Sequence, residues 1–329
     1  MTHSAADDKP PPHADRRMLP ADPTSEEARL RYEMPPAGPR VQHVRRHLPP
    51  TLLAEPRVIK AVRRIEQDLP HDHQLAELAR ANGLSPFHFH RLFAEVMGEA
   101  LSGFIRRQRL DAAAIRLAAS ELSMLEIGTV AGYGSLAAFS RAFQRQFGVA
   151  PTVYRPAARA AVRPPVPEQL AMADRVRLER WEIRPLVGLR FHGGYDQAEC
   201  YWARFADEVR LRLGLDPDTL ECYALIRDNP LITAQGLIRY DCCFADPGLP
   251  EELPAPFARL PPMQISRCAT LLLEAPYRKV FAAYRAIANV WTARHGEHFA
   301  EAPAMERYHA PPWRRMGQVQ SFSIMVMLI

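Results

Sequence analysis

Gly83-Leu84-Ser85-Pro86-Phe87-His88-Phe89-His90-Arg91-Leu92-Phe93 is the stretch that decides the fold of the first half of the chain. Ser85 suits a helix N-cap, and Pro86 suits the first helical position, where its missing N–H costs nothing. A second helix is expected before Gly83, over residues 74–82, with the small Ala79 where the two helices cross closely. Two short helices joined by a tight turn predict a helix-turn-helix.

The helix that follows Ser85 has two chemically different faces. At helical spacing, one face is an apolar stripe of Phe89, Leu92, Phe93 and Val96. The opposite face carries Phe87, His90 and Arg91. Because the apolar stripe is needed for the core, the other face is left for a partner, and in this motif the second helix enters the major groove of DNA.

The pattern returns fifty residues later. Five positions of the first unit recur with this interval: Ser85, Arg91, Phe93, Gly98 and Phe104 correspond to Ser135, Arg141, Phe143, Gly148 and Tyr154. A second helix-turn-helix is therefore predicted, with the outward residues Leu136, Ala137, Ala138 and Arg141. Residues 101–119 between the units form an apolar-seamed helix of roughly 28 Å. Such a rod separates two reading helices by close to one DNA turn, about 34 Å.

These blocks resemble the DNA-binding domain of the AraC/XylS transcription regulators over about a third of the chain. The resemblance is carried by residues 84–93, 106–113, 132–135, 139–143 and 147–151, followed by Tyr154-Arg155. It departs from the family at Gly128, where alanine is more common, and at residues 136–138, where polar side chains are common. The resemblance implies double-stranded promoter or operator DNA as a partner, with RNA polymerase as a further one.

Proline content and apolar pattern divide the chain into a leader, two domains and a linker. Residues 1–56 hold 11 of the 31 prolines and little periodic apolar pattern, so a disordered leader is expected there. A proline-marked linker is expected over 159–171, which leaves 57–158 for the helix-turn-helix domain and 172–329 for a second domain. The sequence shows neither a signal-peptide pattern nor an apolar run of membrane-spanning length, which predicts a cytoplasmic protein.

Positive charge is concentrated in the helical half. Residues 56–159 contain 14 Lys or Arg and 9 Asp or Glu, whereas residues 170–329 contain 19 of each. The net charge of +5 therefore lies in the predicted DNA-binding domain, as attraction to phosphates requires. Four arginines are candidate phosphate contacts, with an ordinary solvated role as the alternative for each: Arg63, Arg64, Arg155 and Arg159.

The cysteine and histidine patterns favour neither a metal nor a cofactor. All five cysteines lie in the second half, show no Cys-x-x-Cys spacing, and are expected to be free thiols. Cys242 and Cys243 leave a redox or metal sensor open as a minor alternative. His88 and His90 diverge at i, i+2 on a helix, so they do not form a ligand pair.

A second internal repeat, with an interval of 82 residues, covers the second half. Tyr195, Trp202 and Pro230 correspond to Tyr277, Tyr284 and Pro312, and residues 239–244 correspond to 321–326. Helices are expected over 197–213 and 278–295, and strands near 186–192, 223–227, 237–245, 265–274, 305–309 and 321–329. Two such strand-helix-strand-strand units form one antiparallel sheet with both helices on one face and a cleft between the repeats. The predicted fold is multidomain: an all-α double helix-turn-helix domain followed by an α+β domain.

The second half resembles the GyrI-like effector-binding domain of multidrug-responsive regulators over about 150 residues. The resemblance is carried by Gly193-Gly194-Tyr195, Ala275-Pro276-Tyr277, residues 239–241 and residues 306–308. It implies a small cationic or aromatic ligand bound at the family's glutamate, which matches Glu306. The first repeat has Ala224 at the corresponding place, so Glu306 is a carboxylate on one side only of a symmetric apolar cleft. Five aromatic residues are candidate pocket walls that can stack on a planar cation: Tyr195, Tyr240, Tyr277, Tyr308 and Trp313.

These features together predict a transcription regulator that binds DNA through its first domain and senses a small molecule through its second. Two alternatives stay open for the second domain. It could hydrolyse a small electrophile with Glu306, as hydrolase members of the resembling family do, or it could bind another protein. The sequence shows no arrangement of nucleophile, base and orienting residue, so an enzyme is not expected.

Overall fold

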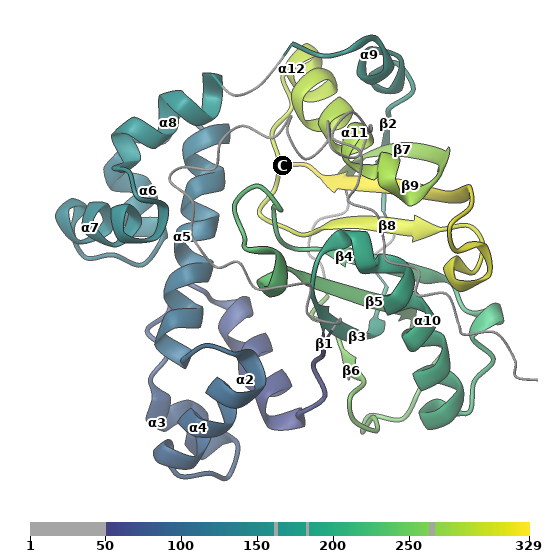
Figure 1. Ribbon diagram of the computed structural model, residues 1–329, viewed down its shortest axis with the longest axis horizontal. Coiled ribbons are helices and arrows are strands. Elements are labelled where there is room, and N and C mark those ends of the chain that lie inside the picture. Colours follow the sequence, from purple (N-terminus) through teal and green to yellow (C-terminus); the bar gives the residue numbers. More distant parts are fainter. Residues whose placement is uncertain (1–50, 161–163, 182–183, 263–266) are drawn as a thin grey trace, which may run out of the picture. The chain divides into compact units, whose positions relative to one another are not determined.

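The computed structural model describes residues 51–160, 164–181, 184–262 and 267–329. It shows helices through residue 160 and a sheet-rich domain after them, which confirms the predicted order of an all-α domain and an α+β domain (Figure 1). The predicted leader up to residue 50 lies outside the described residues, and so do residues 161–163 of the predicted linker. None of the described helices is long and apolar enough to cross a membrane.

Three helices form the first helix-turn-helix unit: α2 (Pro56–Gln67), α3 (Leu75–Ala81) and α4 (Pro86–Met97). The Ser85 hydroxyl accepts a hydrogen bond from the backbone N–H of His88 at 3.3 Å, so α4 begins where its sequence predicts. Gly98 ends α4 with φ at 70°, a left-handed conformation that glycine adopts without strain. Phe89 and Phe93 of α4 are fully buried and form the centre of this unit.

Helix α5 (Leu101–Ala119) joins the two units and has the bounds that the sequence predicts. The second unit comprises α6 (Met124–Val130), α7 (Leu136–Phe147) and α8 (Pro151–Ala160). Its recognition helix α7 is bounded in the same way as α4. The Ser135 hydroxyl accepts the backbone N–H of Ala138 at 3.2 Å, and Gly148 ends the helix with φ at 77°. The fifty-residue repeat is therefore a repeat of helix boundaries as well as of residues.

Gly128, where the resembling family more often has alanine, has a packing explanation. It is buried in α6 against Phe139 of α7, which is itself fully buried. A Cβ atom at this position would lie 3.2 Å from the Cβ of Phe139, closer than ordinary van der Waals contact. Glycine therefore lets α6 and α7 approach each other, and alanine would require Phe139 to shift.

The second domain is built on one antiparallel sheet, in which nine strands fall within the described residues. The strands are β1 (Thr51–Leu52), β2 (Arg177–Arg180), β3 (Leu186–His192), β4 (Cys222–Ile226), β5 (Arg239–Ala245), β6 (Ala258–Arg259), β7 (Arg267–Ala275), β8 (Ala304–Tyr308) and β9 (Gln320–Met327). Their order is β1-β3-β5-β4-β8-β9-β7-β2, with β6 beside β3. The two repeats, β3-β5-β4 and β7-β9-β8, thus meet where β4 pairs with β8.

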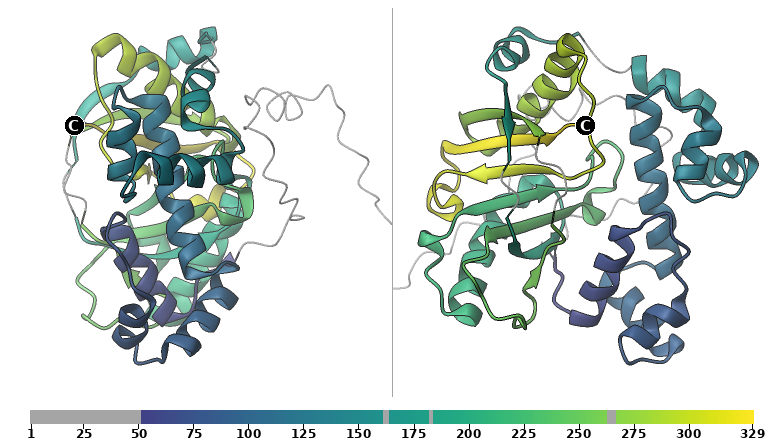
Figure 2. Two further views of the ribbon diagram at one scale, coloured as in Figure 1. Left: turned by 90° about the vertical axis from the view of Figure 1, so that its left-hand side faces the viewer. Right: turned by 180° about the vertical axis from the view of Figure 1, so that it is seen from behind.

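Each repeat contributes one helical run to the same face of the sheet, and the second view of Figure 2 shows the sheet from its other side. The first run is η1 (Tyr195–Gln197), α10 (Ala198–Glu208) and the π-helical turn η2 (Val209–Leu213). The second is η5 (Tyr277–Lys279), α11 (Val280–Arg285), the π-helical turn η6 (Ala286–Trp291) and α12 (Thr292–His295). Both runs agree closely with the helices predicted from the sequence. Short 3₁₀ turns complete the domain: η3 (Pro217–Thr219), η4 (Gln235–Leu237) and η7 (Pro312–Arg315).

Two segments differ from their predicted role as leader or linker. Thr51 and Leu52, at the end of the predicted leader, form β1 and pair with β3 in the sheet of the second domain. Leu53 follows them and is buried. The predicted linker contains α9 (Pro167–Ala173), which packs against α11 and η6. Both segments are too short for a periodic pattern to reveal, and tertiary pairing orders them.

Candidate effector site and DNA-binding surface

Glu306 lies on β8 at the junction of the two repeats. Its partner in the β4–β8 register is Ala224, the residue that corresponds to it in the first repeat. Both side chains are fully buried, on the face of the sheet that α10 and α11 cover. Met305, one residue earlier on β8, belongs to the apolar cluster of the opposite face. The difference between the repeats that the sequence showed, Glu306 in one and Ala224 in the other, therefore lies where β4 pairs with β8.

Four tyrosine hydroxyls donate hydrogen bonds to the Glu306 carboxylate. Tyr308 donates to Oε2 at 2.9 Å and Tyr240 to the same atom at 3.3 Å. Tyr277 lies 3.2 Å from both oxygens, and Tyr284 lies 3.3 Å from Oε1. A carboxylate offers about four lone-pair positions, so the four phenols can satisfy it without a charged partner. These four residues, Tyr240, Tyr277, Tyr284 and Tyr308, are called the tyrosine cage below.

Glu306 is the group at the tyrosine cage that titrates near neutral pH. Burial raises the pKa of Glu306 to about 7, because the loss of water penalises the charged form more than the four phenols stabilise it. Burial also raises the pKa of each cage tyrosine well above its ordinary value. The phenols therefore stay neutral, and near neutral pH a small change in surroundings decides whether Glu306 is protonated or ionised.

The cleft expected between the repeats is closed in this structure. Glu306 is 0% exposed, and aromatic rings occupy the space in front of it. Tyr308 stacks on Phe322 with ring centroids 5.3 Å apart and meets the edge of Trp202 at 5.0 Å. The prediction of an open cleft is corrected for a physical reason: the sheet and both helical runs supply large rings that fill the junction.

Two predicted wall residues lie beside the tyrosine cage without contacting Glu306. The Tyr195 hydroxyl donates to the backbone carbonyl of Asp228 at 2.6 Å, and its ring meets that of Tyr240 edge-on at 6.0 Å. Trp313 donates its Nε1–H to Asp218 at 2.8 Å. Tyr240, Tyr277 and Tyr308 do contact Glu306, as described above.

The sequence interpretation missed Tyr284 as a partner of Glu306. The 82-residue repeat contained the signal, because Tyr284 corresponds to Trp202 in the first repeat. Both side chains point from the helical runs toward the junction, since the Trp202 Nε1–H lies 3.2 Å from the Tyr240 hydroxyl. A repeat-based reading of helix positions, and not only of strand positions, would therefore have found it.

The predicted DNA-reading residues lie on the outer faces of α4 and α7. On α4, Phe87 is 70% exposed, and His90 and Arg91 are also exposed. On α7, Leu136, Ala137 and Arg141 are exposed and Ala138 is half-buried. The exposed face of α4 therefore presents an aromatic ring beside an imidazole and a guanidinium.

Three of the four candidate phosphate arginines bond inside the protein. Arg155 donates to the carbonyl of Leu122, and Arg159 donates to the carbonyl of Ser120 at 2.6 Å. Arg63 donates to the carbonyl of Arg259, in the second domain. Burial lowers the pKa of Arg63 to about 10. Arg63 is therefore corrected from a phosphate contact to a packing residue, whereas Arg64 is exposed on α2.

The cysteines are free thiols, four of them buried and Cys200 exposed. Burial raises the pKa of Cys242 and of Cys243, which disfavours the reactive thiolate. In the described part of the chain, no group of three or more His, Cys, Asp or Glu side chains is arranged to hold a metal ion.

Known proteins match the two halves separately. Residues 78–157 match a helix-turn-helix domain, and residues 175–319 match the GyrI-like small molecule binding domain. The chain is 34% identical over 85 residues to the HTH-type transcriptional regulator Rv1931c of Mycobacterium tuberculosis, which is 26% of this chain and 33% of that protein. It is 33% identical over 91 residues to the regulatory protein SoxS of Escherichia coli K12, which is 28% of this chain and 85% of SoxS.

Among solved structures, the DNA-binding domain of AdpA in complex with a target DNA is similar to 32% of this chain and 96% of its own, with 28% identity and a TM-score of 0.31. The match to Rv1931c spans only a third of that protein, whereas the match to SoxS spans most of it. The matches to Rv1931c, SoxS and AdpA cover 26%, 28% and 32% of this chain, and the two-repeat sheet is covered by the match to the GyrI-like domain. The chain belongs to the AraC family of transcription regulators and carries a GyrI-like small-molecule-binding domain.

Proposed function

We propose that this protein is a sequence-specific DNA-binding regulator whose second domain senses an apolar, aromatic cation at Glu306. The observation that carries the proposal is a fully buried carboxyl group whose hydrogen-bond partners among the described residues are all neutral phenols. The helix-turn-helix half would bind a promoter or operator, with RNA polymerase as a further proposed partner. Such a regulator acts where the chromosome is, so we place it in the cytoplasm.

A cation is the ligand that best compensates the cost of burying Glu306. Desolvation of an unpaired carboxylate is unfavourable, and here it is strong enough to hold the pKa near 7 in spite of four hydrogen bonds. A positive charge within a few ångströms would favour the ionised form and lower that pKa. Aromatic walls add a cation–π contribution of about 2 kcal/mol when the cation is desolvated. Charge and shape therefore select the same class of ligand.

The closed tyrosine cage must open for a ligand to enter, and α11 supplies the accessible side. Tyr284 of α11 is half-buried, whereas the other three members of the cage, Tyr240, Tyr277 and Tyr308, are buried. Phe281, one helical turn before Tyr284, is 38% exposed, and its ring lies 5.9 Å from that of Tyr195. We propose that a ligand enters beside Tyr284 and displaces its hydroxyl from Glu306.

Calorimetric titration of the full chain with tetraphenylphosphonium, an aromatic cation, and with neutral triphenylphosphine oxide tests this function. Glu306→Gln keeps the side-chain shape and removes the charge, so it should weaken the cation at least tenfold and leave the neutral compound nearly unchanged. The matched control is Glu274→Gln, an exposed glutamate on β7. Equal weakening of both compounds, or no weakening of either, would show that Glu306 is not the counter-charge.

We also propose that the second domain is a sensor and not a hydrolase. The matched relatives are transcription regulators, which does not favour the hydrolase alternative. In addition, the four phenols occupy the lone-pair positions that a general base would need for an attacking water. Incubation with an activated ester should show no hydrolysis that depends on Glu306. Turnover that Glu306→Gln abolishes would restore the enzyme alternative.

A further inference from the structure

On the face of the sheet opposite the tyrosine cage, six charged side chains form a group in which four are buried and two are half-buried. Its members, called the ionic cluster below, are Glu66, Arg190, Arg227, Asp228, Arg239 and Asp241. Five of them come from β3, β5 and the end of β4, whereas Glu66 comes from α2 in the DNA-binding half. Within the ionic cluster three acids balance three arginines, and α2 supplies one of the acids, Glu66.

Glu66 binds two arginines of the sheet at once. Its Oε1 accepts hydrogen bonds from Nη1 of Arg190 and Nη1 of Arg239, each at 2.6 Å. Arg227 lies 3.9 Å from Oε2. Burial by itself would raise the pKa of Glu66, but the guanidinium groups of Arg190, Arg239 and Arg227 lower it to about 2. Glu66 is therefore ionised at any physiological pH and held in place by charge.

The arginines keep other partners, so the loss of Glu66 leaves an excess positive charge in the protein interior. Arg190 donates to both oxygens of Asp241, at 2.6 and 2.9 Å. Arg239 pairs in the same way with Asp228, and Arg227 donates to Asp241 at 2.7 Å. Two aspartates would then face three arginines. An uncompensated buried charge is strongly destabilising. The folded protein is therefore much more stable with Glu66 bound to Arg190 and Arg239 than without it.

Strand β5 belongs to both the ionic cluster and the tyrosine cage. Tyr240 reaches Glu306 on one face, and its neighbours Arg239 and Asp241 lie in the ionic cluster on the other. The β4–β5 connection extends the link, because its Thr233 donates to Asp111 of α5 at 3.0 Å. A single hairpin thus contacts the candidate ligand site, the first helix-turn-helix unit and the helix that joins both units.

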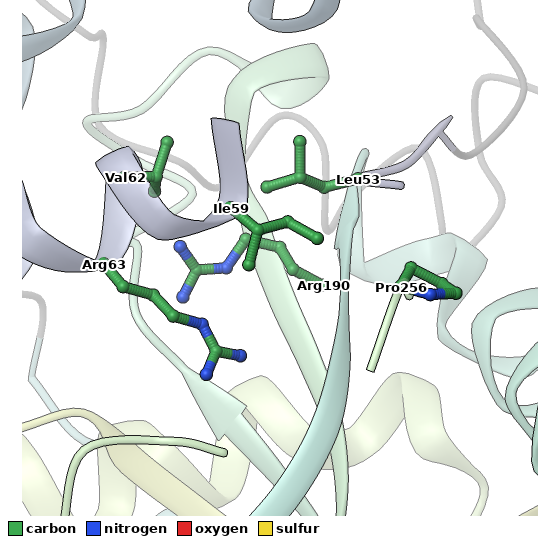
Figure 3. A pocket seen from close by; sticks show the side chains of 6 residues that line it. All are labelled: Leu53, Ile59, Val62, Arg63, Arg190 and Pro256. Atoms are coloured by element: carbon green, nitrogen blue, oxygen red, sulfur yellow. The ribbon is translucent and has the colours of Figure 1, made fainter. Parts of the chain in front are cut away.

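The contact between α2 and the sheet is close but leaves a small void. Leu53, Ile59, Val62, Arg63, Arg190 and Pro256 line a cavity of about 10 Å³, in which Arg63 and Arg190 extend on neighbouring sides (Figure 3). This volume is about the size of one water molecule. A nearly filled contact with a charged anchor responds to small shifts of β5, because β5 cannot move relative to α2 without straining the hydrogen bond that Arg239 donates to Glu66.

We propose that Glu66 ties α2 of the DNA-binding half to the sensor sheet, and that β5 transmits a change in the tyrosine cage to that tie. The second part rests on the proposed function of the tyrosine cage, whereas the first part does not. A ligand that displaces the Tyr284 hydroxyl changes the surroundings of the carboxylate that Tyr240 also contacts, and the strand segment of Tyr240 carries two members of the ionic cluster. The consequence is a change in how firmly α2, and with it the first recognition helix, is held.

Hydrogen exchange of the full chain, followed by mass spectrometry, tests the tie. In Glu66→Gln, the amides of α2 should exchange at least tenfold faster than in the unmodified protein, because α2 loses its charged anchor on the sheet. The matched control is Glu77→Gln, an exposed glutamate on α3, which should leave these rates unchanged. Unchanged α2 exchange in Glu66→Gln would overturn the proposal.

A double variant separates release of α2 from general loss of stability. Glu66→Gln combined with Arg227→Gln leaves Arg190 with Asp241 and Arg239 with Asp228, a balanced pair of ion pairs. The sheet should regain its unmodified exchange rates, while α2 stays fast. Recovery of α2 in the double variant would show that charge imbalance alone loosened it, and that Glu66 is not a tie.

Tyr240→Phe tests transmission without any ligand, since it removes one hydroxyl from Glu306 on the cage face of β5. It should speed α2 exchange several-fold, and it should add little when Glu66→Gln is already present. The control is Tyr201→Phe, whose hydroxyl bonds the carbonyl of Gly194 in the same apolar core. An effect confined to the cage strands would overturn transmission and leave only the tie. Failure of tetraphenylphosphonium to bind would instead count against the proposed ligand class.

Discussion

Glu66 and Glu306 are glutamates with little or no exposure to water, yet their surroundings shift their pKa values in opposite directions. Guanidinium groups outweigh desolvation at Glu66 and lower its pKa to about 2. Phenols do not outweigh it at Glu306, and burial raises that pKa to about 7. The difference is one of charge, because a phenol supplies a hydrogen bond while a guanidinium supplies a hydrogen bond and a positive charge. The same residue type is therefore an anchor at one site and a responsive group at the other.

The raised pKa of Glu306 predicts a pH dependence of stability with a definite sign. Between its ordinary pKa of 4.5 and the folded value of about 7, the folded protein holds a proton that the unfolded chain has lost. The free energy of unfolding should therefore fall as pH rises through this window and level off above it, by about 3 kcal/mol at most. Urea unfolding at pH 5 and pH 8, followed by tryptophan fluorescence, measures the change.

The control for this prediction must account for Asp111, whose pKa burial also raises to about 7. The change with pH should be smaller in Glu306→Gln than in the unmodified protein, and the difference between the two isolates Glu306. Identical pH profiles for the two proteins would mean that Glu306 is ionised in the folded state throughout, and that the tyrosine cage stabilises the carboxylate more than its burial implies.

At the scale of elements, α4 and α7 share their boundaries but differ in their outer surfaces. Both begin at a serine N-cap and end at a left-handed glycine, so both are 12 residues long. In its first two turns, the exposed face of α4 offers an aromatic ring, an imidazole and a guanidinium, whereas the first two turns of α7 offer mainly methyl groups and Arg141. Hydrogen-bonding capacity for base edges is therefore concentrated on α4.

This difference predicts unequal effects of two matched arginine substitutions. Arg91→Ala should cost about 1 to 3 kcal/mol in DNA affinity and relax the preference at one base pair, as loss of a bidentate guanine contact does. Arg141→Ala, the matched change on α7, should relax a position in the other half of the site. In vitro selection of binding sequences with each variant measures both effects. A loss of affinity that is equal for all sequences would make the residue concerned a phosphate contact.

At the scale of the whole molecule, two unlike recognition helices in one chain predict an asymmetric binding site. Helix α5, between the two units, has 19 residues and so a length close to one DNA turn, which lets one chain occupy two successive major-groove segments. Most sequence specificity should lie in the segment read by α4. Footprinting of a selected site should show one chain covering two unequal halves. A perfect palindrome occupied by two chains would contradict this expectation.

The sequence by itself determined every feature that has a local or periodic signature. Helical spacing predicted α5, the Ser85 N-cap predicted the start of α4, and the fifty-residue repeat extended that prediction to α7, because these signals are local or periodic. The 82-residue repeat predicted the sheet and, through the mismatch of Ala224 and Glu306, the position of the candidate ligand site. Tyr284 could also have been predicted as a member of the site, since the same repeat relates it to Trp202.

Only the tertiary structure decided that the cleft is closed and that Glu66 joins the two halves. Glu66 lies 124 residues from Arg190 and 173 from Arg239, and no spacing along the chain records such a partnership. In the sequence, Glu66 is one helix glutamate among several, and its arginines look like solvated strand residues. Burial strengthens the attraction between Glu66 and these arginines, because packing removes the water that would otherwise screen their charges.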